Sequence, residues 1–362
     1  MFQKGLKDVV AVHTEIASVD GEKGELRYRG IGVGNLLPTH SFEEVAYFLW
    51  NGRIPSEEES RTLNEKMLAG RVLPEHIIAI IDAFPREMLL MDAMRTAISA
   101  YAHADFTRKS IEDQAILLTA ALPVIIARHY RNQQEQPIVE ANPALSHTAN
   151  YLWMLTGELP NDVQVEALET YLKLTMEHGL NASTFAARVT ISTESDITSA
   201  VTSAIGTMKG PLHGGAPSAV IELLEEIGTP ENIRPVVEKK MTSGERIMGF
   251  GHRIYKTEDP RSILLRDTCI SLSGQDEWLD LATAAEKEII ALLATYKPGR
   301  KLYTNVEFYA AAIMRSIDMP PVLFTPTFSA ARIVGWTAHA MEQSNDNTIF
   351  RPQSVYTGEW ID

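Results

Sequence analysis

The sequence of 362 residues has little cysteine, no long apolar run and no cluster of positive charge. Cys269 is its single cysteine, so it can form neither an intrachain disulfide nor a cysteine metal cluster, and a reducing compartment is expected. No apolar stretch approaches the ~20 residues of a membrane helix. The N-terminal segment carries charges where a signal peptide would be apolar. We therefore expect a cytoplasmic protein without a membrane partner.

The charge balance is acidic, with 33 Lys and Arg against 47 Asp and Glu and a net charge of -14. This balance opposes attraction to phosphate backbones, and no basic tail offsets it, so nucleic acid is not an expected partner. An anionic ligand would have to be met by local cations. The 45% hydrophobic content can supply a large core in one big domain or two smaller ones.

Helical periodicity dominates after a short N-terminal hairpin, and no alternation of strands with helices is visible. Asp20-Gly21 and Gly24 indicate a turn between strands at 15–19 and 25–29. Between 41 and 51, apolar residues recur at spacings of three and four after a capping box that begins at Ser41. Similar segments predict helices at about 56–69, 74–83, 91–103, 110–131, 144–156, 161–178, 181–193, 195–208, 216–227, 232–241, 260–273, 276–295, 304–317 and 327–344. The pattern predicts a large all-α protein.

Three short segments, at 209–216, 248–252 and 305–307, are candidates for chemistry because two combine glycine with histidine and the third places a carboxylate beside an amide. Glycine lets backbone approach a ligand closely. Each segment alone is a weak signal, since a histidine in a glycine-rich turn commonly serves only to bond backbone groups. The glycine patterns match neither a dinucleotide fingerprint nor a phosphate-binding P-loop. No H-E-x-x-H occurs, so we expect no metal site.

Together these segments resemble the citrate synthase family over nearly the whole chain. Seven stretches occur in the family's order: GLKDVVAVHTEIASVDGEKGELRYRG, EHGLNASTFAAR, GPLHGGA, GFGHRIYKTEDPR, NVEFYAA, FSAARIVGWTAH and IFRPQSVYTG. Such an ordered set is far more specific than any single glycine loop. The resemblance implies an acyltransferase that condenses acetyl-CoA with oxaloacetate and hydrolyses citryl-CoA to citrate and CoA.

The resemblance also implies a two-domain, all-α homodimer with a small N-terminal β-hairpin and an active site between its domains. Residues 1–212 and 313–362 correspond to the large domain. Residues 213–312 correspond to a smaller, mobile helical domain. Coenzyme A enters as a thioester co-substrate, and no tightly bound cofactor is expected.

The family's catalytic positions fall on His213, His252 and Glu307. By resemblance Glu307 takes the methyl proton of the thioester, His213 donates a hydrogen bond to the thioester oxygen, and His252 acts on the ketone of oxaloacetate. Many members carry Asp where this chain has Glu307. Because one extra methylene moves the carboxylate by about a bond length, we expect the local backbone to compensate.

Oxaloacetate is a dianion, for which the fixed donor fork of arginine is well suited. The family's substrate positions match Arg261, Arg332 and Arg351, with Arg351 reaching into the partner subunit's site, and His178 matches a further substrate-contacting residue. An isolated arginine is ordinarily a surface ion pair, so the shared motif context carries this assignment.

Coenzyme A requires local cations for its phosphates. By family position Lys256 is the first candidate, and the lysines and arginine of K-P-G-R-K are weaker ones that equally fit a solvated turn. The backbone from Ile247 to Gly251 resembles the family's adenine-recognition loop. The cofactor-binding candidates are thus Ile247, Gly249, Gly251, Lys256, Lys297, Arg300 and Lys301.

Two alternatives stay open at this point. Acetyl-CoA and propionyl-CoA differ by one methylene, which a hydrophobic pocket discriminates by only ~1–3 kcal/mol, so a 2-methylcitrate synthase is the second reading. A non-catalytic CoA-binding homologue is a third, disfavoured because every catalytic position keeps a functional group.

Overall fold

The computed structural model describes residues 3–6, 8–214, 218–251, 254–272, 274–299 and 302–361. Helices dominate these residues, as the periodicity predicts. The elements are η1 (Lys4–Leu6), β1 (Ala17–Asp20), β2 (Glu25–Tyr28), β3 (Ile31–Gly32), α1 (Val33–Leu36), η2 (Leu37–Thr39), α2 (Phe42–Asn51), α3 (Glu57–Gly70), α4 (Glu75–Asp82), α5 (Leu90–Ser99), α6 (Ala104–Thr107), α7 (Ile111–Gln133), α8 (His147–Thr156), α9 (Asp162–Thr175), α10 (Ala182–Ile191), α11 (Ile197–Met208), α12 (Ser218–Ile227), η3 (Pro230–Asn232), α13 (Ile233–Thr242), α14 (Pro260–Ser271), α15 (Glu277–Tyr296), α16 (Val306–Ser316), η4 (Pro321–Leu323) and α17 (Phe324–Asn345).

Local capping chemistry sets several helix ends. Ser41 and Ser56 each form a complete capping box, and Gly52 ends α2 in the left-handed conformation at φ 74°. These ends are the predicted ones. Helices α1 and α6 have four residues each, too few to show a helical period, and were not predicted.

The predicted hairpin forms the first two strands of a small antiparallel sheet. Its register pairs Ala17 with Tyr28 and Asp20 with Glu25, and the two-residue strand β3 joins the edge of β2. The turn between β1 and β2 lies against the segment 254–258. There the Lys256 N–H donates to the Gly21 carbonyl at 2.9 Å, and a Cβ on Gly21 would lie 2.2 Å from the Ile254 oxygen. Glycine is therefore required at this close approach.

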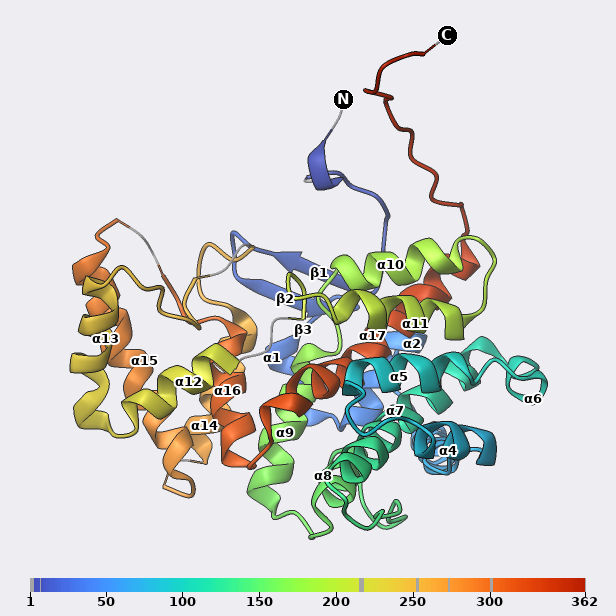
Figure 1. The fold of residues 1–362 in the computed structure, drawn as a ribbon, viewed down its shortest axis with the longest axis horizontal. Helices are drawn as coiled ribbons and strands as arrows, with labels where there is room; N and C mark the ends of the chain where they lie inside the picture. Colours follow the sequence, from blue (N-terminus) through green and yellow to red (C-terminus); the bar gives the residue numbers. More distant parts are fainter. Residues whose placement is uncertain are drawn as a thin grey trace.

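The helices form two lobes (Figure 1). Helices α12 to α16 make the smaller lobe, in which α15 packs on α13, α14 and α16. The remaining helices make the larger lobe. The segment after α17 is extended, carries no helix or strand over residues 346–361, and leaves the body on the same side as the N-terminal residues.

Helix α17 is the centre of the larger lobe and contacts α2, α5, α7, α9, α10 and α11. Sixteen of its residues are buried, including Arg332, Trp336 and His339. The helix passes so close to the chain after α9 that a Cβ on Gly335 would lie 2.4 Å from both the Met176 carbonyl oxygen and Glu177 Oε2. This contact fixes the position of α17 relative to His178.

Candidate active site

A cleft with a volume of about 1010 Å³ is lined by residues from both lobes. Its lining comes from α9 and the residues after it, the loop after α11, the segments 246–251 and 254–261, the end of α15, residues 302–305, the start of α16 and the start of α17. Although the whole chain is acidic, the lysine and arginine side chains that line the cleft outnumber the carboxylates among the described residues, so the cleft can accept an anion. They are Arg246, Arg261, Lys297 and Arg332 against Asp259 and Glu307.

Glu307 lies in the first turn of α16, and Asn305 at the start of that helix is hydrogen-bonded to the segment 247–251. Asn305 caps α16 by accepting the Glu307 N–H at 3.0 Å, while its own side-chain amide donates to the Gly251 carbonyl at 3.0 Å. Burial raises the pKa of Glu307, and the positive charges of Arg261 and Arg246 oppose that rise. A carboxylate with a raised pKa is a stronger base than one in water.

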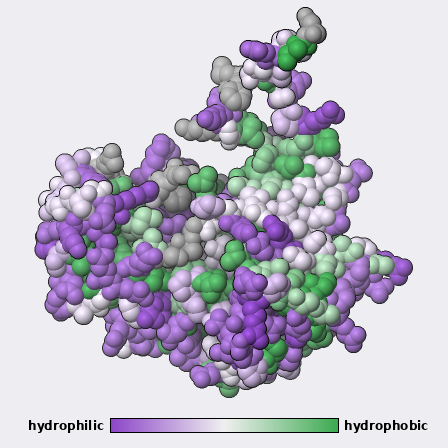
Figure 2. All heavy atoms as spheres, in the orientation of Figure 1, coloured by the Kyte–Doolittle hydropathy of each residue, from purple (hydrophilic) through white to green (hydrophobic). Residues whose placement is uncertain are grey.

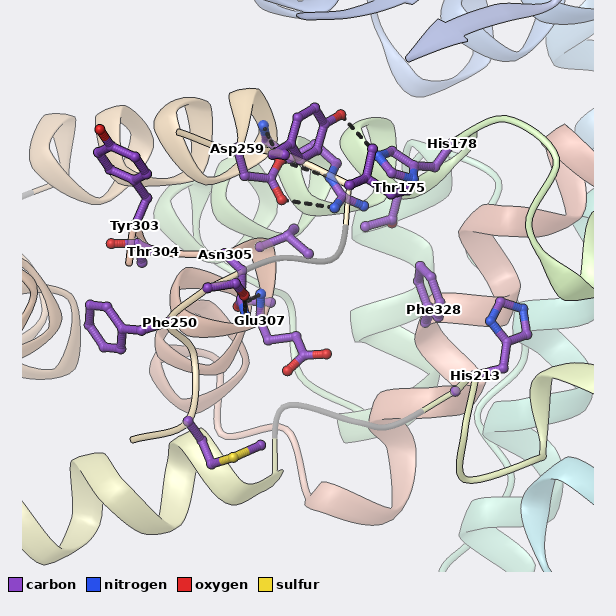
Figure 3. A pocket seen from close by; sticks show the side chains of 18 of the residues that line it. Thr175, His178, His213, Phe250, Asp259, Tyr303, Thr304, Asn305, Glu307 and Phe328 are labelled. Carbon is purple, nitrogen blue, oxygen red and sulfur yellow. Dashed lines mark hydrogen bonds and ion pairs between the residues drawn. The ribbon is translucent and has the colours of Figure 1, made fainter. Parts of the chain in front are cut away.

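His213 faces Glu307 across the cleft (Figure 3). Its Nε2 lies 2.7 Å from Ser183 Oγ and accepts the Ser183 backbone N–H at 3.2 Å. Because a backbone N–H can only donate, Nε2 carries no proton, and a neutral ring must bear its proton on Nδ1. Burial, helped by the positive charge of Arg332, lowers the pKa of His213 to about 4, which keeps the ring neutral. His213 is thus a neutral donor through Nδ1.

Arg332 is buried at the floor of the cleft with part of its donor fork unused. Its Nε donates to the Thr175 carbonyl at 2.6 Å, and its guanidinium carbon lies 4.8 Å from the centre of the Phe328 ring. Its two Nη atoms make no hydrogen bond or ion pair with any residue that the structure describes. Burial lowers the pKa of Arg332, and the negative charge of Glu177 opposes that fall. Such a fork suits a carboxylate.

Arg261 is already paired. Its Nε and Nη2 donate to the two carboxylate oxygens of Asp259 at 3.1 and 2.8 Å. Burial alone would lower the pKa of Arg261, but the Asp259 carboxylate outweighs it and the pKa is raised. Tyr255, on the same segment, places its hydroxyl 3.0 Å from His178 Nε2. The predicted substrate residues His178 and Arg261 therefore line one wall, in contact with two residues that the sequence did not single out.

The predicted coenzyme A residues are only partly gathered here. Ile247, Gly251 and Lys297 line the cleft. Gly249 lies behind it at φ 85°, where a Cβ would come within 2.9 Å of the Phe308 ring. Lys256 is exposed and pairs with Glu22 on the β1–β2 turn.

Three further predicted residues, His252, Arg300 and Lys301, fall outside the described residues. Arg351 is exposed on the extended segment after α17 and is not among the residues that line this chain's own cleft.

Several functional candidates went unnoticed in the sequence. Asp259 and Tyr255 are inside the quoted H-R-I-Y-K-T-E-D-P-R run. Only its contacts distinguish Tyr255 from the other residues there, whereas the Asp-Pro pair at the start of α14 was an available signal for Asp259. Arg246 immediately precedes the predicted Ile247–Gly251 loop, and that position was the available signal. Ser183 and Trp336 lie in quoted stretches, but their link to His213 depends on tertiary packing.

In the part of the chain that the structure describes, no three His, Cys, Asp or Glu side chains are grouped so that they could hold a metal ion. No described helix has both the length and the apolar character needed to cross a bilayer.

A model of the family described as citrate synthase, C-terminal domain, matches residues 5–353. With the helical fold and the cleft, this match defines an acyltransferase of the class that converts the acyl group into an alkyl group on transfer. The chain belongs to the citrate synthase family.

Full-length relatives agree with this assignment. The chain is 38% identical over 368 residues to a citrate synthase of Synechocystis, covering 99% of this chain and 91% of the relative. It is 36% identical over 363 residues to a 2-methylcitrate synthase of Mycobacterium tuberculosis, with the same coverage. The fold matches the citrate synthase of Pyrobaculum aerophilum with a TM-score of 0.90 at 34% identity, covering 99% of this chain and 94% of that one.

A second solved structure adds ligands. The citrate synthase of Thermoplasma acidophilum, described as a ternary complex with carboxymethyl coenzyme A and oxaloacetate, matches with a TM-score of 0.87 at 30% identity. The match covers 100% of this chain and 97% of that one.

Proposed function

We propose that this enzyme condenses acetyl-CoA with oxaloacetate and hydrolyses the resulting citryl-CoA to citrate and CoA. One observation carries the proposal: a half-buried carboxylate, Glu307, faces a neutral histidine donor, His213, across a cleft whose floor holds the partly unused donor fork of Arg332. A base, an oxyanion donor and an anion receptor are the three groups that the condensation needs.

In this mechanism Glu307 removes a proton from the acetyl methyl group. The negative charge moves to the thioester oxygen, where the Nδ1–H of His213 stabilises it. The methylene carbon then attacks the ketone carbon of oxaloacetate, and the ketone oxygen takes a proton with the help of His252. Water finally cleaves the citryl thioester and releases CoA.

Oxaloacetate is proposed to bind by its two carboxylates. The free Nη groups of Arg332 receive one of them. Arg261 and His178 contact the substrate from the opposite wall, with Asp259 and Tyr255 holding their orientation. Arg351 supplies a further cation from a second subunit.

Acyl-CoA is proposed to approach from the side of the segment 247–251. The backbone of Ile247, Gly249 and Gly251 meets the adenine, and Lys256, Lys297, Arg300 and Lys301 neutralise phosphates. The Thermoplasma relative, described as a complex with a CoA analogue and oxaloacetate, supports this pair of ligands.

We further propose that residues 213–312 move as a unit to close the cleft and that two copies of the chain assemble. Pale and hydrophobic side chains gather over α10 and α11 in Figure 2, which suits a subunit interface. A cytoplasmic location fits the buried free thiol of Cys269 and two substrates that are water-soluble anions.

A 2-methylcitrate synthase is the second candidate, favoured by the Mycobacterium tuberculosis relative. A thiol-release assay with acetyl-CoA or propionyl-CoA, each with and without oxaloacetate, separates the two. We expect oxaloacetate-dependent release with acetyl-CoA at the higher kcat/KM. Faster release with propionyl-CoA would establish the second candidate, and no release with either would remove the enzyme assignment.

A further inference from the structure

A buried tryptophan is linked to the predicted enolate-stabilising histidine through one serine. Trp336 on α17 is fully buried, and its indole N–H donates to Ser183 Oγ at 2.9 Å. Ser183, in the first turn of α10, contacts His213 through both its hydroxyl and its backbone N–H. The three residues thus form a chain from the core of the larger lobe to the cleft.

The hydroxyl hydrogen of Ser183 has two acceptors within reach, His213 Nε2 at 2.7 Å and Asn181 Oδ1 at 2.8 Å. Because His213 Nε2 accepts a hydrogen bond from the Ser183 backbone N–H, this nitrogen is unprotonated and presents its lone pair to Ser183. If the hydroxyl turned to Asn181, an oxygen lone pair would face this nitrogen lone pair at 2.7 Å. The hydroxyl hydrogen therefore points to His213.

The indole strengthens this arrangement. By donating to Oγ, Trp336 occupies one oxygen lone pair and polarises the hydroxyl, so the hydroxyl becomes a better donor toward Nε2. The alternative tautomer, with its proton on Nε2, would set that hydrogen against the hydrogen of the Ser183 backbone N–H, and only the one Oγ lone pair that the indole does not occupy could accept it. The indole thus disfavours the ring form that lacks an Nδ1–H.

We infer that Trp336 is a positioning residue that holds His213 in its Nδ1–H tautomer by fixing the hydroxyl of Ser183. The inference rests on the proposed role of His213. It predicts that loss of the indole N–H impairs the chemical step and leaves oxaloacetate binding intact, because Trp336 is fully buried and does not line the cleft.

The test replaces Trp336 by Phe, with Trp50→Phe as the matched control. Trp50 is also buried, and its indole N–H donates to the hydroxyl of Thr337 on α17 at 2.9 Å. This hydrogen bond is not connected to a residue that lines the cleft. We expect Trp336→Phe to lower kcat about tenfold or more with KM for oxaloacetate within about twofold, since misplaced reacting groups act on kcat. Trp50→Phe should keep its kcat.

Two measurements separate positioning from loss of packing. Combining Trp336→Phe with Ser183→Ala should lower kcat no further than Ser183→Ala alone. Nitrogen-15 shifts of His213, assigned with a His213→Gln variant, should report the Nδ1–H tautomer in the wild type and a mixture in Trp336→Phe. If the Phe variant does not fold, benzothienylalanine at 336 keeps the shape of tryptophan and replaces its N–H with sulfur.

A kcat for Trp336→Phe equal to that of Trp50→Phe, or an unchanged tautomer, would overturn the inference. Failure of the proposed function would look different. In that event His213→Gln would retain thiol release, or the wild type would show none, whatever the state of Trp336.

Discussion

At the residue scale, Glu307 is the proposed base, and this position allows a direct test of that role. Glu307→Gln keeps size and hydrogen bonding but cannot accept a proton. It should therefore abolish both condensation and exchange of the acetyl methyl protons with solvent. Glu307→Asp should cost about tenfold, because shortening the side chain withdraws the carboxylate by ~1 Å.

Circular dichroism and oxaloacetate affinity on both Glu307 variants control for misfolding. A Gln variant that retains most of its activity would exclude Glu307 from the mechanism. A fully active Asp variant would show that the site accepts either length.

The acid side of the pH profile should also report on Glu307. His213 is neutral above about pH 4, so protonation of Glu307 limits activity first as the pH falls. Arg246 opposes the rise in the pKa of Glu307; hence Arg246→Gln should raise that pKa and move the acid limb of kcat/KM to higher pH. Lys297→Gln removes another cleft cation that does not contribute to this shift, and should leave the limb in place. A limb that stays in place in Arg246→Gln would contradict this electrostatic role.

The sequence motifs allowed several residues of the site to be predicted, but not the hydrogen bonds that those residues make with distant parts of the chain. The glycine-flanked histidine and the carboxylate of α16 could be read from the sequence, since those residue types have few other uses in such a context. The pairing of Tyr255 with His178 depends on where a loop packs in three dimensions, and nothing in the local sequence encodes that distance. The pairing of Asp259 with Arg261 is local instead, because Asp259 caps α14 two residues before Arg261, and the Asp-Pro pair at this helix start was an available signal.

At the scale of elements, α17 passes close to the chain after α9 at Gly335. Replacing this glycine should therefore destabilise the fold more than replacing a glycine that has space around it. Gly335→Ala places a methyl group 2.4 Å from both the Met176 carbonyl and Glu177 Oε2, so we expect a loss of about 1–3 kcal/mol in unfolding free energy. Gly206→Ala, in the interior of α11, meets only Arg95 at 3.6 Å. It should be neutral or stabilise by up to ~1 kcal/mol, because alanine favours helix.

Urea unfolding of the two glycine variants gives the comparison. Equal stabilities would mean that α17 can shift without strain. A destabilised Gly335→Ala variant should also bind oxaloacetate less tightly, since α17 carries Arg332.

Elements were predictable where their signals are local. A capping serine and a terminal glycine set the ends of α2, and alternating residues around a turn predicted β1 and β2. Strand β3 has two residues and exists through its pairing with β2, a tertiary contact that no period reveals.

At the scale of the whole molecule, binding should be ordered. The cleft presents the free Nη groups of Arg332 before any thioester arrives, so oxaloacetate should bind first and close the lobes. Oxaloacetate alone should raise the melting temperature and slow proteolysis, with CoA alone having little effect. If CoA protects and oxaloacetate does not, the order is reversed.

Assembly gives a second test at this scale. Arg351 lies on the extended segment and is not among the residues that line its own chain's cleft, so we expect it to act in a partner's site. Mixing equal amounts of inactive Arg351→Ala and Glu307→Ala subunits should restore about a quarter of the wild-type activity per subunit, because each mixed dimer has one intact site. No recovery despite demonstrated subunit exchange would exclude a role in trans.

The partly unused donor fork of Arg332 has a consequence for the evolution of this protein. A desolvated cation without a full set of acceptors raises the free energy of the folded, empty enzyme, and only the substrate supplies the missing acceptors. Heat resistance and catalysis therefore make opposite demands on this residue. Selection for the most robust version of the fold, without selection for turnover, would be expected to discard this arginine early.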